Sequence, residues 1–150
     1  MAITEHRRIG FDAGGLLLFL ILMLPNFIWF AFPAPHDILR AESVTDALDA
    51  AASAVQIMTV ISLCLVMDRN QKRSIPKPFL YGIVLSCLLY FGGWIFYYRG
   101  TVSTPVLLDL SVAPCLALLL FAAARKNKIA FACAAVFMIL HVLSTLINFI

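Results

Sequence analysis

Residues 14–32 read GGLLLFLILMLPNFIWFAF, a run of 19 residues without a charged side chain. A helix needs about 20 residues to cross the roughly 30 Å hydrocarbon layer of a bilayer, so this run has the length of one span. Basic residues precede it, but the apolar part of a signal peptide is only about 7–15 residues long. Pro33 and Pro35 stand where a small-residue cleavage motif would lie. We therefore expect a span that the protein retains.

Four further runs have the same character, and the predicted spans are approximately 14–32, 46–67, 79–98, 105–124 and 129–149. Apolar residues make up 63% of the 150 residues and charged residues 13%. Soluble domains have roughly 45–50% and about 25%, so a soluble enzyme domain, a disordered chain and a secreted disulfide scaffold are excluded. No alternating barrel pattern is present. We predict an all-α polytopic membrane protein, a single domain over 1–150 formed by a bundle of five transmembrane helices.

Basic residues fall in alternate connections, and this pattern predicts the orientation. Nine lie on one side of the membrane, namely Arg7, Arg8, Arg69, Lys72, Arg73, Lys77, Arg125, Lys126 and Lys128. The other side has only Arg40 and Arg99. Short connections rich in Lys and Arg stay in the cytoplasm, so we expect the amino terminus inside and the carboxyl terminus outside. The predicted location is the cell membrane (inner or plasma membrane), crossed several times, with membrane lipids as partners and no nucleic acid.

The predicted outer side is acidic. Its carboxylates are Asp37, Glu42, Asp46, Asp49 and Asp109. Against two basic residues they give this side a net charge of −3, and an acidic vestibule would attract cations. The alternative is that acids are only tolerated there, because they contribute little to orientation.

Polar residues inside spans follow helical spacing in two places. The second span has Glu42, Asp46, Asp49, Ser53 and Gln56, and the fifth has His141, Ser144 or Thr145, and Asn148. Polar groups at membrane depth are costly and face the bundle interior or water. Asp49 and Gln56 lie too deep for a solvated helix start, so we expect them to line the interior. For His141 the simplest role is a hydrogen bond to another helix, and the alternatives are proton transfer or ligand binding.

Prolines interrupt two of the spans. Pro25 frees the backbone carbonyl of Ile21 beside Asn26, and Pro114 acts likewise in the fourth span. Freed carbonyls are tolerated where protein or water satisfies them. We expect the candidate ligand-binding residues to converge at these kinks: Asn26, Asp49, Gln56, Asp109 and His141. The alternative is that the kinks only shape packing.

Aromatic residues crowd the third span. Tyr90, Trp94 and Tyr97 or Tyr98 share one face. Such residues near a span end typically form an interfacial belt. If the face turns inward with Trp29 opposite, it forms a wall for an apolar or cationic ligand, so Tyr90 and Trp94 join the candidate ligand-binding residues.

Enzyme and cofactor signatures are absent. The chain has no GxSxG, HExxH, P-loop or GxGxxG motif. The cysteines lie inside apolar runs without a CxxC pair, so we interpret them as small apolar filler: Cys64, Cys87, Cys115 and Cys133. We predict no catalytic residue, no cofactor and no metal site. The residues with suitable chemistry for a metal have no ligand spacing: His36, Asp37, Asp46, Asp49 and His141.

A series of short motifs runs along most of the chain. It consists of Leu24-Pro25-Asn26 with Trp29, Pro33-Ala34-Pro35, Asp49 through Gln56, Trp94 with Tyr97-Tyr98-Arg99-Gly100, Lys126-Asn127 and His141. Their order resembles a group of small five-span bacterial membrane proteins of unassigned function. That group has Glu and Gly-Gln where this chain has Asp49 and Val55-Gln56. The resemblance implies the five-span fold and no particular activity.

Three hypotheses for the function follow. The leading one is binding or translocation of a small cationic or amphipathic ligand through an outward-facing polar cavity, in which Asp49, Asp109 and His141 set the charge. The second is an accessory or assembly subunit, within a homo-oligomer or larger membrane complex. Its exposed small-residue faces, which would pack on the partner, would be Ala130 with Ala134, or Gly82 with Ser86. The third is an intramembrane enzyme that uses the same three titratable residues.

Overall fold

The computed structural model describes residues 7–68 and 74–150 of the chain. Within these residues it has five long helices: α1 (Ala13–Ala31), α2 (Asp46–Leu65), α3 (Lys77–Tyr98), α4 (Thr104–Ala124) and α5 (Lys128–Phe149). Each helix is long and apolar enough to cross a membrane. Each begins and ends within two residues of a predicted span. The predicted all-α fold with five membrane-length helices is confirmed.

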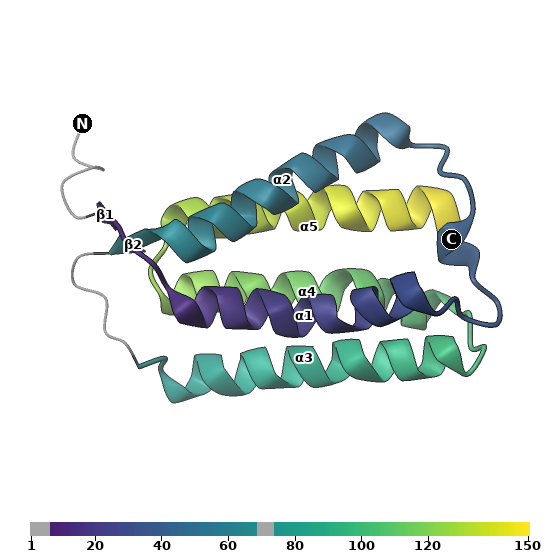
Figure 1. Cartoon of the computed structure of the whole chain (residues 1–150), viewed down its shortest axis with the longest axis horizontal. Helices are drawn as coiled ribbons and strands as arrows, with labels where there is room; N and C mark the ends of the chain where they lie inside the picture. Colours follow the sequence, from purple (N-terminus) through teal and green to yellow (C-terminus); the bar gives the residue numbers. More distant parts are fainter. Residues whose placement is uncertain (1–6, 69–73) are drawn as a thin grey trace.

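The helices are arranged around α4, which is the most buried of the five (Figure 1). α4 packs against α3 on one side and against α5 on the other, and α5 packs in turn against α2. α1 lies beside α4 and packs more loosely on its neighbours. Most of the α1 surface therefore faces outward. The exposed leucine and phenylalanine side chains of α1 suit a surface that lipid covers.

The two ends of the bundle differ, and Figure 1 shows both. At one end β1 (Arg7–Ile9) pairs antiparallel with β2 (Val66–Asp68), a short ribbon that the sequence does not predict. We call this the ribbon end. The opposite end has the connections 32–45 and 99–103, the first of which contains the 3₁₀ turn η1 (Ile38–Arg40), and we call it the loop end.

Polar contacts close the ribbon end. The backbone N–H of Asp12 donates to the carbonyl of Cys64 at 2.8 Å, which joins the start of α1 to the end of α2. The Asp12 carboxylate forms an ion pair with Arg125 at 2.9 Å, in the turn between α4 and α5. In the same turn the side-chain amide of Asn127 donates to the carbonyl of Ser62 at 2.8 Å. Four helices are therefore tied together at this end.

Gly15 allows the close approach of α1 to α2 near the ribbon end. A Cβ atom at this position would lie 2.9 Å from the backbone carbonyl oxygen of Leu63, and a backbone atom cannot rotate away. We expect Gly15→Ala to lower the free energy of unfolding in detergent micelles by about 1–3 kcal/mol, the usual cost of overpacking.

Gly92 provides the matched control, because a Cβ atom there would meet nothing within 4 Å. Alanine has the higher helix propensity, so Gly92→Ala should leave the stability unchanged or raise it by up to about 1 kcal/mol. An equal loss for Gly15→Ala and Gly92→Ala would mean that α1 and α2 do not touch as described.

The small-residue faces proposed for a partner subunit pack inside the bundle instead. Ala130 and Ala134 are each 0% exposed and Ser86 is 2% exposed. The space beside Gly82 is filled by the side chain of Leu120, 2.9 Å from the position of an added Cβ. The prediction that these faces are free is wrong, because they are used for close contact between helices of the same chain.

Candidate functional site

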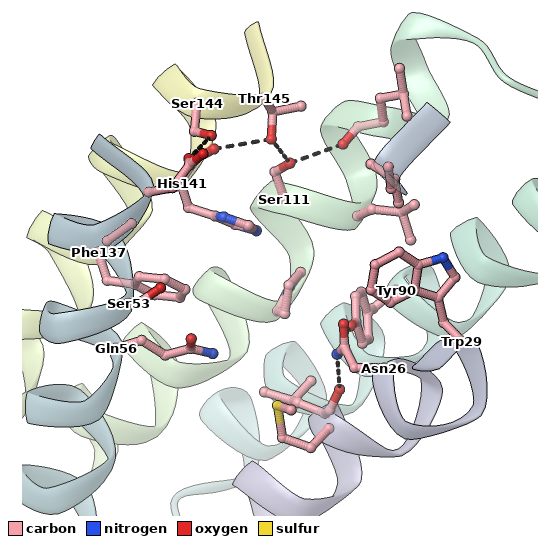
Figure 2. A pocket seen from close by; sticks show the side chains of 18 of the residues that line it. Asn26, Trp29, Ser53, Gln56, Tyr90, Ser111, Phe137, His141, Ser144 and Thr145 are labelled. Carbon is pink, nitrogen blue, oxygen red and sulfur yellow. Dashed lines mark hydrogen bonds between the residues drawn. The ribbon is translucent and has the colours of Figure 1, made fainter. Parts of the chain in front are cut away.

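A cavity of about 430 Å³ lies in the half of the bundle nearer the loop end. All five helices and the 32–45 connection line it. From α2 and α5, Gln56, Ser53, Phe137 and His141 face Asn26, Tyr90 and Trp29 of α1 and α3 across the cavity, as Figure 2 shows. The lining thus combines polar groups and aromatic rings on both sides of the cavity.

Six of the seven predicted site residues line this cavity: Asn26, Asp49, Gln56, Tyr90, Trp94 and His141. The seventh, Asp109, is not among the lining residues, so its expected convergence with the others is wrong. Its carboxylate instead fills the space beside Gly93 of α3, where an added Cβ would lie 2.3 Å from Oδ2. The next residue of α4, Leu110, takes the cavity-facing position, about 100° further around the helix.

Asp49 is held at the edge of the cavity by hydroxyl groups. Its carboxylate accepts hydrogen bonds from Ser43 in the connection and from Ser144 of α5. Asn148, further along α5, donates to the Thr45 hydroxyl and accepts from the Val44 N–H at 2.8 Å. These contacts fix the start of α2 against α5 and fix the direction of the carboxylate. Among the described residues that line the cavity, Asp49 has the only carboxylate, and none is Lys or Arg.

Four polar side chains of the lining have no hydrogen-bond partner within the described part of the chain, and one of them is the buried indole N–H of Trp94. The imidazole of His141 stacks on Phe137 with 5.2 Å between the ring centres and points into the cavity (Figure 2). The hydrogen bond to another helix that was expected for His141 does not form. The Gln56 amide and the Ser53 hydroxyl are the other two. Unsatisfied polar groups at membrane depth favour a cavity that holds water or a polar ligand.

Other polar groups nearby are satisfied inside the protein. The hydroxyls of Ser111 and Thr145 lie 2.6 Å apart and join α4 to α5. The Asn26 amide donates to the Tyr90 hydroxyl at 2.7 Å and to the Leu22 carbonyl at 3.2 Å. The amide does not donate to the carbonyl of Ile21, which Pro25 leaves free beside it. The side chain reaches the carbonyl four residues before its own position, which faces the same side of the helix.

The aromatic face of α3 turns inward and does not form a belt on the surface. Tyr90 is 3% exposed and Trp94 is 6% exposed. Trp94 meets Tyr90 and Tyr97 edge to face, with 6.4 and 5.7 Å between ring centres, and it lies 6.2 Å from Trp29. The two tryptophans of the chain therefore stand on the same wall of the cavity. The Trp29 ring already holds one cation, because the Arg40 guanidinium lies over it at 4.9 Å from the ring centre.

Asp37 organises the loop end, a role that sequence reasoning missed. Its carboxylate accepts from the Trp29 indole N–H at 2.9 Å, the Tyr97 hydroxyl at 2.8 Å and the Arg40 guanidinium at 3.0 Å. Burial acts to raise the pKa of Asp37. The hydrogen bonds from Trp29 and Tyr97 lower it, and so do a further hydrogen bond from the Ala34 N–H and the positive charge of Arg40. Together they outweigh burial and hold the pKa below its ordinary value. No pattern in the sequence marks this residue, because its partners lie 8 and 60 positions away.

A second hollow lies on the outside of the bundle, between α1 and α3. It has a volume of about 370 Å³ and is lined by Pro25, Ile28, Phe91, Trp94, Ile95, Tyr98 and Arg99. Trp94 belongs to both hollows, whereas Trp29 lines only the central cavity. Among the described residues, no three His, Cys, Asp or Glu side chains lie close enough to hold a metal ion.

Comparisons with known proteins leave the chain without an assigned family. A scan against family models, a search of curated proteins and a search of solved structures find no match. The resemblance to small five-span bacterial proteins therefore stays a prediction. The five apolar helices indicate a small multi-pass membrane protein.

Proposed function

We propose that this protein binds a small cationic or amphipathic ligand in the central cavity. The observation that carries the proposal is the composition of the lining, which among the described residues has one carboxylate, no Lys or Arg, and the aromatic rings of Trp29 and Trp94. A carboxylate in a site of low dielectric constant attracts a cation more strongly than it would in water, and tryptophan faces add cation–π attraction. The same lining repels anions.

The polar groups without protein partners support the proposal further. The His141 imidazole, the Gln56 amide and the Ser53 hydroxyl lie on the same side of the cavity, which Asp49 also lines. A bound ligand or its water would provide the hydrogen bonds that these groups lack. Binding is better supported than translocation, because the contacts at the ribbon end close the other side of the bundle.

We also propose that the loop end faces outward from a bacterial cell membrane, so that the cavity lies in the outer half of the bilayer. The count of basic residues along the chain supports this orientation. Of the nine that carry it, Arg69, Lys72 and Arg73 lie outside the described residues.

Intrinsic tryptophan fluorescence tests the proposal, because both tryptophans line the cavity. N-butylpyridinium is a suitable probe, since its charged ring quenches indole fluorescence on contact. We expect saturable quenching of the protein in lipid nanodiscs at pH 8. Neutral 4-butylpyridine, which has the same size, should bind about tenfold more weakly, as expected for the loss of one charge-assisted contact. Quenching that rises linearly with either compound, without saturation, would contradict the proposal.

A further inference from the structure

The central cavity is covered at the loop end by the 32–45 connection. On one side of the cavity this connection is tied to α1 and α3, since Asp37 accepts from Trp29 and Tyr97. On the other side it is tied to α5, since the Val44 N–H donates to Asn148 at 2.8 Å. The connection therefore spans the cavity from one wall to the other and restricts a direct path from the aqueous phase.

The side of the cavity between α1 and α2 is less closed. These helices are joined at the ribbon end, where Asp12 bonds to Cys64, and they diverge toward the loop end (Figure 1). In the diverging part both helices contribute lining residues, among them Met23 from α1 and Ser53 from α2. Ser53 lines the cavity, and its side chain is exposed and not covered by a neighbouring helix. Together with the divergence of the two helices, this exposure points to an opening of the cavity between them.

This opening lies at the depth of the hydrocarbon layer. Ser53 is seven residues beyond the first residue of α2, or about 10 Å along the helix at 1.5 Å per residue. The neighbouring surface is apolar, with Leu24 of α1 52% exposed and Ile57 of α2 60% exposed. In a bilayer, acyl chains would stand in front of the opening.

We infer that the ligand enters sideways from the membrane, between α1 and α2, and that it is a single-tailed amphipathic cation. This inference rests on the proposed function and specifies its ligand class. The charged head lies at Asp49, near His141, where the lining is polar. The apolar tail lies in the opening beside Phe19 and Met23, whose side chains are also apolar. A ligand dissolved in the membrane reaches this site without crossing the 32–45 connection.

Blocking the opening tests the inference. Ser53→Trp places a large side chain in the opening, and Ala54→Trp is the matched control, because Ala54 is exposed on α2 but does not line the cavity. The probes are N-dodecylpyridinium, which has head and tail, and N-methylpyridinium, which has the head alone. Because these variants add a tryptophan, binding is measured by isothermal titration calorimetry in nanodiscs against empty nanodiscs. Ser53→Trp should weaken binding of the dodecyl compound about tenfold or more and of the methyl compound about threefold or less, since only the tail needs the opening.

Two outcomes would overturn the lateral route. One is equal weakening of dodecyl binding by Ser53→Trp and Ala54→Trp. The other is equal weakening of both probes by Ser53→Trp. A second pair on the opposite helix, Met23→Trp with Leu24→Trp as its control, repeats the test if Ser53→Trp does not fold. Absence of saturable binding of either probe to the unmodified chain would instead reject the proposed function, and the lateral route with it.

Discussion

Replacing Asp37 with alanine should lower the free energy of unfolding by about 2–4 kcal/mol, because a donor left without its acceptor costs about 1–3 kcal/mol and Asp37 is the acceptor for two such donors. The Tyr97 side chain is 0% exposed, and its hydroxyl donates to Asp37. The Trp29 indole N–H donates to the same carboxylate. Without Asp37 both donors stay in the protein with no acceptor, and the charge of Arg40 loses its partner. The 32–45 connection should detach from α1 and α3.

Glu42→Ala provides the matched control for this change. Glu42 is an exposed carboxylate in the same connection, and no hydrogen bond to it is found within the described residues. Its removal should change the stability by no more than about 0.5 kcal/mol, as at most surface positions. Chemical unfolding in detergent micelles measures both variants. A similar small effect for both would mean that Asp37 does not hold the loop end together.

Asp49→Asn should weaken binding of N-butylpyridinium about tenfold or more. A contact between a charged donor or acceptor and its partner contributes about 1.5–3 kcal/mol, and 1.4 kcal/mol corresponds to a factor of ten. Asparagine keeps the size of the side chain and retains an oxygen that accepts from Ser43 or Ser144, so the start of α2 should stay in place. The loss therefore reports the charge and not the fold.

Asp46→Asn is the control for the charge change. Asp46 is one turn earlier on α2, exposed, and outside the cavity. If attraction by the general negative charge of the loop end governs binding, both substitutions should weaken it equally. If the ligand sits at Asp49, the Asp46→Asn chain should bind as the unmodified chain does. Equal effects of the two substitutions would place the cation outside the cavity.

The sequence predicts the helices of this protein well because the membrane simplifies the problem. A run such as residues 14–32 has to satisfy its backbone hydrogen bonds within itself, and a helix is the structure that does so. The polar spacing in α2 and α5 predicts which faces turn inward, since Asp49 and His141 at the lipid surface would be costly. Periodicity therefore identified one wall of the cavity, the side that α2 and α5 form.

The remaining features depend on contacts between distant residues. Asp109 was assigned to the cavity because of the kink beside it, but an adjacent helix with glycine at position 93 offers another place for a carboxylate. Asp37 lies in a connection without periodicity, and its role arises only when α1 and α3 place Trp29 and Tyr97 around it. The β1–β2 ribbon pairs two segments that lie nearly 60 residues apart. Each segment has only three residues, which is too short for a strand pattern to stand out in the sequence.

The most direct test of the ligand site uses Trp29 as the only fluorescent reporter, in a chain with Trp94→Phe. Of the two hollows, Trp29 lines only the central cavity, whereas Trp94 also lines the outer hollow between α1 and α3. Titration with N-butylpyridinium should quench Trp29 to saturation, and adding Asp49→Asn should raise the dissociation constant about tenfold. If Trp29 fluorescence does not respond while the unmodified chain is quenched, the cation binds in the outer hollow, and the central cavity is not the site.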